Sequence, residues 1–174
     1  MNVITTTRRF VLREFEPPDA DLFVAYQTAP DFAMFHLASE RGEDHARRVF
    51  RLFLDWQLER PRDNYQLAIA ALERPANLIG SCGIRQERCA EGEAVFGIEL
   101  ARSYWGRFRY AQEVSEALIN WAFDTLQLSA LVADTAFEND AVARLAEACG
   151  FVRTHADEKQ WWRLERSAWH GNIT

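Results

Sequence analysis

Lysine is almost absent from this chain of 174 residues: Lys159 is the single lysine, and arginine supplies the other 19 of the 20 basic side chains. The 26 acidic side chains outnumber them, which gives a formal net charge of −6. A net-acidic chain lacks the uniform positive field that binding to a nucleic-acid backbone requires, so we expect no nucleic-acid partner. Because arginine holds phosphate and carboxylate better than lysine does, the positions of the arginines are more informative than their number.

Cysteine and histidine are also scarce. The three cysteines, Cys82, Cys89 and Cys149, have no C-x-x-C spacing, and we expect them to be structural thiols in a reducing compartment. The four histidines are scattered, without the helix-face or hairpin spacing of a metal site, so we expect no metal.

Long apolar runs are missing as well. No stretch approaches the ~20 apolar residues of a membrane helix, and the first ten residues lack the apolar run of a signal peptide. We therefore expect a cytoplasmic protein with no membrane partner. The chain shows no repeat and no low-complexity linker, and its length predicts a single domain over residues 1–174.

The apolar patterns that are present predict both strands and helices. Strands are expected over residues 8–16, 65–72, 78–84, 94–100, 130–136, 151–154 and 160–165. Helices are expected over residues 21–27, 43–59 and 110–126, and from residue 138 to a cap at Gly150, with a further short turn at residues 31–36. Residues 73–77 and 85–93 are expected to be a turn and a loop. This mixed order predicts an α+β fold with a mixed sheet, in which the apolar strand 94–100 lies centrally.

Two segments resemble a known family. The first is Phe-Gly-Ile-Glu-Leu-Ala-Arg-Ser-Tyr-Trp-Gly over residues 96–106, which runs on to Ala-Gln-Glu over residues 111–113. The second is Asn-Asp-Ala-Val over residues 139–142, followed by Cys-Gly-Phe over residues 149–151. Both are similar to the GNAT superfamily of acyl-CoA-dependent N-acyltransferases, in the branch of the ribosomal-protein alanine acetyltransferases (RimJ/RimL-like). With residues 8–16, 78–80 and 162–169, the similarity spans roughly residues 8–169.

The resemblance implies a splayed, mixed central sheet of about six to seven strands with helices on both faces. It also implies acetyl-CoA as co-substrate and transfer of an acetyl group to a primary amine by direct attack in a ternary complex. The acceptor, a protein N-terminus or a small-molecule amine, is not identified by the sequence. In this branch the acceptor pocket is built from residues 27–45 and the C-terminal hairpin.

The predicted coenzyme site lies where the strand 94–100 ends and the next helix begins. A helix N-terminus carries unpaired N–H groups and a partial positive charge, which suit a pyrophosphate. Backbone groups of Leu100 and Ala101 would pair with the pantetheine arm as an added strand does. The remaining predicted contacts come from the loop and the helix start: Arg102, Gly106, Arg107, Phe108, Arg109, Tyr110 and Ala111.

This loop departs from the family pattern, in which glycines let the backbone close on phosphate. One residue is inserted between Gly106 and Ala111, and Phe108 or Arg109 takes the place of the first expected glycine. The guanidiniums of Arg107 and Arg109 could hold phosphate by charge instead. The alternative is a solvated basic loop without a ligand.

Proton transfer is the second departure. Asn139 could bind the pantetheine arm through its amide, or it could be only a helix cap. Val142 and Ala146 occupy the positions where the family has a hydroxyl that protonates the leaving thiolate, and neither can donate a proton. Glu99 is the candidate general base; alternatively it is an ordinary strand residue that faces solvent or pairs with an arginine. Tyr104 and His36 are weaker candidates for acid or base.

Four tryptophans complete the set of candidates. Trp56 and Trp121 fall in helical patterns and are expected in the core. Trp161 and Trp162 are adjacent, so on a strand they face opposite sides, one of them inward. The other would line the acceptor pocket or an interface of a possible homodimer. Together these features predict an N-acyltransferase, with a non-catalytic GNAT-fold binding or interaction module as the alternative.

Overall fold

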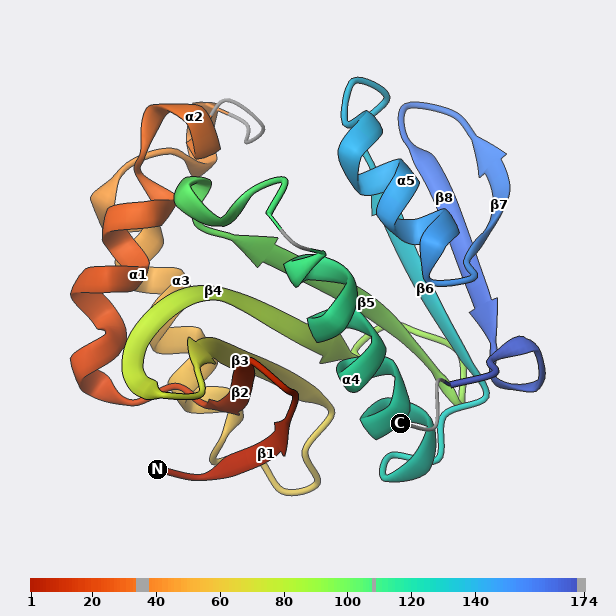
Figure 1. Cartoon of the computed structure of the whole chain (residues 1–174), viewed down its shortest axis with the longest axis horizontal. Helices are drawn as coiled ribbons and strands as arrows, with labels where there is room; N and C mark the ends of the chain where they lie inside the picture. Colours follow the sequence, from red (N-terminus) through yellow and green to blue (C-terminus); the bar gives the residue numbers. More distant parts are fainter. Residues whose placement is uncertain (34–37, 108, 172–174) are drawn as a thin grey trace.

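A computed structural model describes residues 1–33, 38–107 and 109–171. Within them a single sheet of eight strands runs in the order β1-β2-β3-β4-β5-β6-β8-β7 (Figure 1). The strands are β1 (Val3–Thr6), β2 (Phe10–Glu14), β3 (Asn64–Ala71), β4 (Arg74–Arg85), β5 (Glu93–Leu100), β6 (Ala130–Thr135), β7 (Val152–Ala156) and β8 (Gln160–Glu165). All neighbours are antiparallel except β5 and β6, which are parallel.

Helices cover both faces of this sheet. They are α1 (Ala20–Gln27), α2 (Pro30–Ala33), α3 (Glu43–Trp56), α4 (Tyr110–Asp124) and α5 (Asp140–Ala148). One buried cluster joins α1 and α3 to the sheet through residues such as Phe23, Phe50 and Phe53. A second and larger cluster joins α4 to the other face through residues such as Val114 and Leu118. The predicted α+β fold with helices on both faces is therefore confirmed.

The sheet splays where β5 meets β6. β5 pairs with β4 as far as Leu100, but it pairs with β6 only from Glu93 to Val95. Beyond Val95 the two strands diverge, and α4 and α5 flank the opening (Figure 1). The central position predicted for the apolar strand 94–100 is confirmed, because β5 lies between β4 and β6.

Two strand predictions need correction. The sheet has eight strands within the described residues, and not six to seven, because the polar segment Val3–Thr6 forms an edge strand that its few apolar residues do not reveal. Residues 73–77 were expected to be a turn, but β4 already begins at Arg74. Its start holds Pro75, which the ladder accommodates by register shifts opposite Ala70 and Ala71, since proline fits a sheet at irregular positions.

The helix patterns are largely confirmed, although α3 ends at Trp56 and α4 at Asp124, two to three residues earlier than expected. Trp56 is buried and Trp121 packs against the larger cluster, as expected. Trp162 faces inward with an exposed fraction of 3%, and its indole N–H donates to the Thr135 hydroxyl. Among the described residues, none of the helices combines the length and apolar character that a membrane crossing requires.

Candidate active site

A cleft of about 940 Å³ opens between β5 and α4 on one side and α5 on the other. Its volume falls within the range typical of small-molecule and cofactor sites. The predicted site residues in its lining are Glu99, Leu100, Tyr104, Gly106, Arg107, Arg109, Tyr110, Ala111 and Asn139. The structure therefore brings most of the predicted site together where the sheet splays.

The backbone of β5 presents hydrogen-bonding groups to this cleft. Successive residues of a strand point their N–H and C=O groups to opposite edges. The N–H of Ala101 donates to the Ile79 carbonyl at 2.8 Å, so residues 97, 99 and 101 face β4, whereas residues 96, 98 and 100 face the opening. The N–H of Ala101 is therefore engaged by β4, whereas the backbone groups of Ile98 and Leu100 face the opening, and the contact of Leu100 and Ala101 with pantetheine stays a prediction. The Leu100 carbonyl accepts the indole N–H of Trp105 at 2.6 Å.

The loop before α4 compensates in part for its missing glycine. Gly106 has φ +65° and Arg109 has φ +57°, so both adopt the left-handed conformation. Arg109 thus takes the backbone shape that glycine adopts at little cost and that other residues adopt at roughly 1–2 kcal/mol. Arg107 and Arg109 are exposed and line the cleft. Phe108 lies outside the described residues.

Arg102 was predicted to contact the coenzyme, but it lies outside the cleft lining. Its guanidinium is 3.3 Å from the Asp31 carboxylate and 4.9 Å from the centre of the Trp105 ring. It therefore ties α2 to the short 3-10 turn at Arg102–Tyr104. The sequence predicts that Arg102 belongs to the coenzyme loop. Its contact with Asp31, 71 positions away, directs its side chain toward α2 instead.

The first turn of α4 is fixed by an ion pair beneath the cleft. Glu113 accepts hydrogen bonds from the backbone N–H of Arg9 at 2.9 Å and from its side-chain Nε at 2.6 Å. The guanidinium of Arg9 also lies 4.5 Å from the centre of the Tyr110 ring. Burial acts to raise the pKa of Glu113, but hydrogen bonds from Thr7 and Arg9 outweigh it and lower that pKa below its usual value.

Glu99 lies at the end of the cleft nearest α1, inside a buried polar network. One oxygen, Oε1, accepts hydrogen bonds from the Tyr26 hydroxyl at 2.8 Å, the Gln27 amide at 2.5 Å and the Ser81 hydroxyl at 2.8 Å. The network continues to Gln66, whose amide donates to Ser81 at 3.0 Å. Glu99 is therefore half-buried and accepts hydrogen bonds from neutral groups of Tyr26, Gln27 and Ser81, and its role as a base stays a prediction.

The Tyr26 phenol is a donor in this network. Burial raises its pKa well above the usual value, and the negative charge of Glu99 raises it further. Tyr26 consequently keeps its proton across the physiological pH range and donates it in a hydrogen bond to Glu99. Hydrogen bonds to one oxygen hold the carboxylate in a fixed orientation at the cleft.

The contacts of the other candidate site residues say less about proton transfer. Tyr104 lines the cleft, and its hydroxyl accepts a long hydrogen bond of 3.4 Å from the Asn77 amide. The side chain of Asn139 accepts the backbone N–H of Val142 and caps α5, which confirms the cap role. Ala146 is buried, and His36 lies outside the described residues.

Four residues of the site were missed from the sequence. Tyr26, Gln27 and Ser81 lie 73, 72 and 18 positions from Glu99, so no local pattern connects them to it. Arg144 lines the cleft from α5, and its signal was available, because it shares a helix face with Ala141, Leu145 and Ala148. Trp161 is not in the lining; its ring stacks on His155 at 5.6 Å, and its place at a dimer interface remains a prediction.

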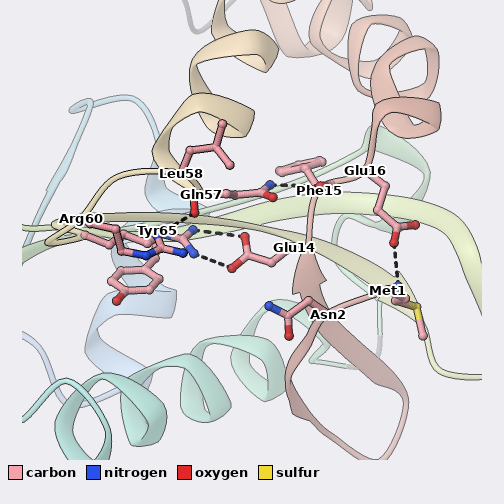
Figure 2. Close-up of a pocket in the computed structure, with 10 residues that line it drawn as sticks. Met1, Asn2, Glu14, Phe15, Glu16, Gln57, Leu58, Arg60 and Tyr65 are labelled. Carbon is pink, nitrogen blue, oxygen red and sulfur yellow. Dashed lines mark hydrogen bonds and ion pairs between the residues drawn. The ribbon is translucent and has the colours of Figure 1, made fainter.

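A second cavity of about 670 Å³ lies beside β2 and the C-terminal end of α3 (Figure 2). Arg62 reaches both carboxylate oxygens of Glu14, at 2.6 and 3.1 Å, and stacks 4.1 Å from the centre of the Tyr65 ring. Arg60 donates to the backbone carbonyls of Gln57 and Glu59. The basic side chains of this cavity are satisfied by the protein itself, so it is a poor candidate for an anion site.

Comparison with known proteins gives a consistent result. Residues 9–152 match the family model described as an acetyltransferase (GNAT) domain. A curated relative, the uncharacterized N-acetyltransferase p20 of Bacillus licheniformis, is 26% identical over 148 residues, which cover 84% of this chain and 81% of the relative.

Solved structures share the fold. A GNAT-family acetyltransferase from Bacillus anthracis superposes with a TM-score of 0.76 at 18% identity, over 96% of this chain and 99% of the other. The spermidine N-acetyltransferase of Vibrio cholerae, solved in complex with CoA and spermine, gives a TM-score of 0.72 at 17% identity, over 91% and 96% of the two chains.

Proposed function

The chain belongs to the GNAT acetyltransferase family, and we propose that it transfers an acetyl group from acetyl-CoA to a primary amine by direct attack in a ternary complex. The observation that supports this most strongly is the cleft at the splay of β5 and β6, whose lining holds the Glu99 carboxylate together with the guanidiniums of Arg107 and Arg109. An amine acceptor and a coenzyme anion need those two environments side by side.

The residues present suit acetyl-CoA, which supplies an acyl group activated as a thioester. The strand edge at Ile98 and Leu100 would pair with the amides of the pantetheine arm. The N-terminus of α4, with Arg107 and Arg109 beside it, would hold the pyrophosphate. Space for this ligand exists at Gly106, where a Cβ atom would meet nothing within 4 Å.

Glu99 is the proposed general base. It would accept a proton from the attacking ammonium, directly or through one water, so that the amine nitrogen can bond to the thioester carbonyl carbon. The carbon–sulfur bond then breaks and the thiolate takes up a proton. Val142 and Ala146 cannot supply that proton. Two tyrosines, Tyr104 and Tyr110, are among the described residues that line the cleft, and Tyr104 is the proposed donor.

The acceptor is proposed as a cationic amine. Glu99 presents a carboxylate that is oriented at the cleft by donors such as Tyr26, Gln27 and Ser81, and a carboxylate attracts an approaching ammonium. The bound spermine of the Vibrio cholerae neighbour is an amine of this class. Protein N-termini, the acceptors of the ribosomal-protein alanine acetyltransferases that the sequence resembles, are the second proposed class.

The test is a thiol-release assay with acetyl-CoA and a panel of polyamines, other small amines and N-terminal peptides. We expect turnover with at least one acceptor, and Glu99→Gln should lower kcat by about 10²–10⁴-fold, the usual contribution of a general base. Glu91→Gln, at an exposed carboxylate in the loop before β5, is the matched control and should leave kcat unchanged. Turnover that survives in Glu99→Gln would refute the assigned base.

The alternative, a non-catalytic GNAT-fold module, is favoured by the hydrocarbon side chains of Val142 and Ala146. Calorimetry with acetyl-CoA separates the two proposals. Binding without thiol release across the whole panel would support a coenzyme-binding module, whereas no binding at millimolar acetyl-CoA would support an interaction module and contradict the enzyme.

A further inference from the structure

We propose that Arg144 on α5 binds the 3′-phosphate of coenzyme A and makes the protein prefer CoA over its dephosphorylated form. This inference rests on the proposed function, because it assigns one more residue of this chain to the same ligand. The two walls of the cleft, at α4 and at α5, differ in the charged side chains that they present.

Arg144 belongs to the face of α5 that lines the cleft. Ala141, Leu145 and Ala148 follow the spacing of one helix face and line the same cavity. The small alanine side chains at either end of this stripe allow a ligand to approach the helix closely. Arg144 is therefore a cation beside an apolar surface that faces α4 and its two arginines.

The charge of Arg144 is not used within the described part of the chain. Asp140 stands four positions earlier on α5, a spacing that allows an ion pair, as Glu43 and Arg47 show on α3 with a contact of 2.8 Å. Arg144 nevertheless forms no ion pair within 4 Å with any described residue. An exposed cation in a net-acidic protein, without a protein partner and facing a cleft, is available to an anionic ligand.

The two helix N-termini at the cleft differ in their suitability for phosphate. The start of α4 has Arg107 and Arg109 beside it, and its one acidic residue in the first turn, Glu113, is paired with Arg9. The start of α5 is capped by Asn139 and flanked by the exposed acids Glu138 and Asp140. The pyrophosphate therefore belongs at α4.

Coenzyme A carries a second phosphate group, on the 3′-oxygen of its ribose. With the pyrophosphate at α4, this group needs a cation of its own in the cleft. Arg144, one turn beyond the acidic start of α5 and on the opposite wall from Arg107 and Arg109, is the cation that the described lining offers. Its guanidinium can donate two hydrogen bonds to one phosphate.

The experiment is calorimetric titration of the purified protein with CoA and with dephospho-CoA. Arg144→Ala should weaken CoA binding by about tenfold, the value of one exposed charge-assisted contact, and change dephospho-CoA binding by less than about twofold. Arg144→Lys should recover part of the loss, because it keeps the charge but not the fork. Arg51→Ala, at an exposed arginine of α3, is the matched control and should change neither affinity.

An equal loss for both ligands in Arg144→Ala would overturn the inference and move Arg144 to the pyrophosphate. No loss for either ligand would also overturn it and leave the proposed function intact. A wild-type protein that binds neither ligand would refute the coenzyme site as a whole. The inference and the proposed function therefore fail by different results.

Discussion

Two cavities of this molecule use arginine in opposite ways. In the cavity beside β2, Arg62 is paired with Glu14 in a bidentate contact and stacked on Tyr65. In the cleft at the splay, the side chains of Arg107, Arg109 and Arg144 form no ion pair with the described residues. Arginine supplies nearly all of the positive charge, so the residue type alone does not separate structural cations from ligand-binding ones. The presence or absence of a carboxylate partner makes that distinction.

This contrast has an energetic basis. A buried charge that loses its ion-pair partner lowers the free energy of unfolding by several kcal/mol. The folded protein therefore depends on the contact between a buried arginine and its carboxylate. An exposed arginine that lacks a partner contributes little to folding and keeps its charge for a ligand. Substitutions in the two cavities should therefore separate stability from coenzyme affinity.

The largest effect is expected from Arg62→Met. The side chains of Arg62 and Glu14 are only 12% and 6% exposed, so the variant leaves a buried carboxylate without its partner. We expect a loss of about 3–5 kcal/mol in the free energy of unfolding, measured by urea titration. The double variant Arg62→Met/Glu14→Leu should recover most of it, and a loss below about 1 kcal/mol would contradict the contrast.

The converse effect is expected from Arg107→Ala and Arg109→Gly. Each removes a guanidinium from the cleft, and we expect each to weaken acetyl-CoA binding by about tenfold in a calorimetric titration at low salt. The glycine at position 109 adopts φ +57° without strain, so its free energy of unfolding should stay equal or rise by up to about 1 kcal/mol. Unchanged affinity in both variants would identify the loop as a solvated surface.

The smallest effect is expected from Glu113→Gln, because its ion pair with Arg9 is only partly buried and Glu113 does not line the cleft. Its lowered pKa means that it stabilises the fold above the unfolded pKa of about 4.3, and that this contribution is lost as pH falls through the folded pKa. We expect the variant to lose about 1 kcal/mol at pH 7 and to approach the wild type below about pH 4. Urea titrations at pH 7 and pH 4 measure this, and a constant difference would exclude the ionic contribution.

Local patterns were sufficient for most of the fold. The apolar spacing of Ala46, Phe50 and Phe53 identifies α3, and all three are buried. The nearly apolar strand 94–100 identifies the centre of the sheet. The edge strand β1 was not predicted, because only two of its four residues are apolar and its strand conformation depends on pairing with β2.

The site was harder to predict, because its partners come from distant segments. Glu99 and the loop of Arg107 and Arg109 were identified from their place at a strand end. The network that orients Glu99 depends on Tyr26, 73 positions away, and the position of Arg102 depends on Asp31, 71 positions away. Neither contact has a local signature, so only the folded chain reveals them.

The splay of the sheet also bears on how the chain folds. Strands β1 to β5 pair only with their neighbours in sequence, in antiparallel ladders that can form one after another. β6 joins them through three parallel pairs, from Glu93 to Val95, after a connection that contains all of α4. The connection from β2 to β3, which contains α1, α2 and α3, also closes a long loop, but five antiparallel pairs form on its closure, against three parallel pairs at β6. The β6-β8-β7 half is therefore expected to dock after β2 to β5 have paired. The seam beside the candidate cleft is thus expected to be the last part of the sheet to form.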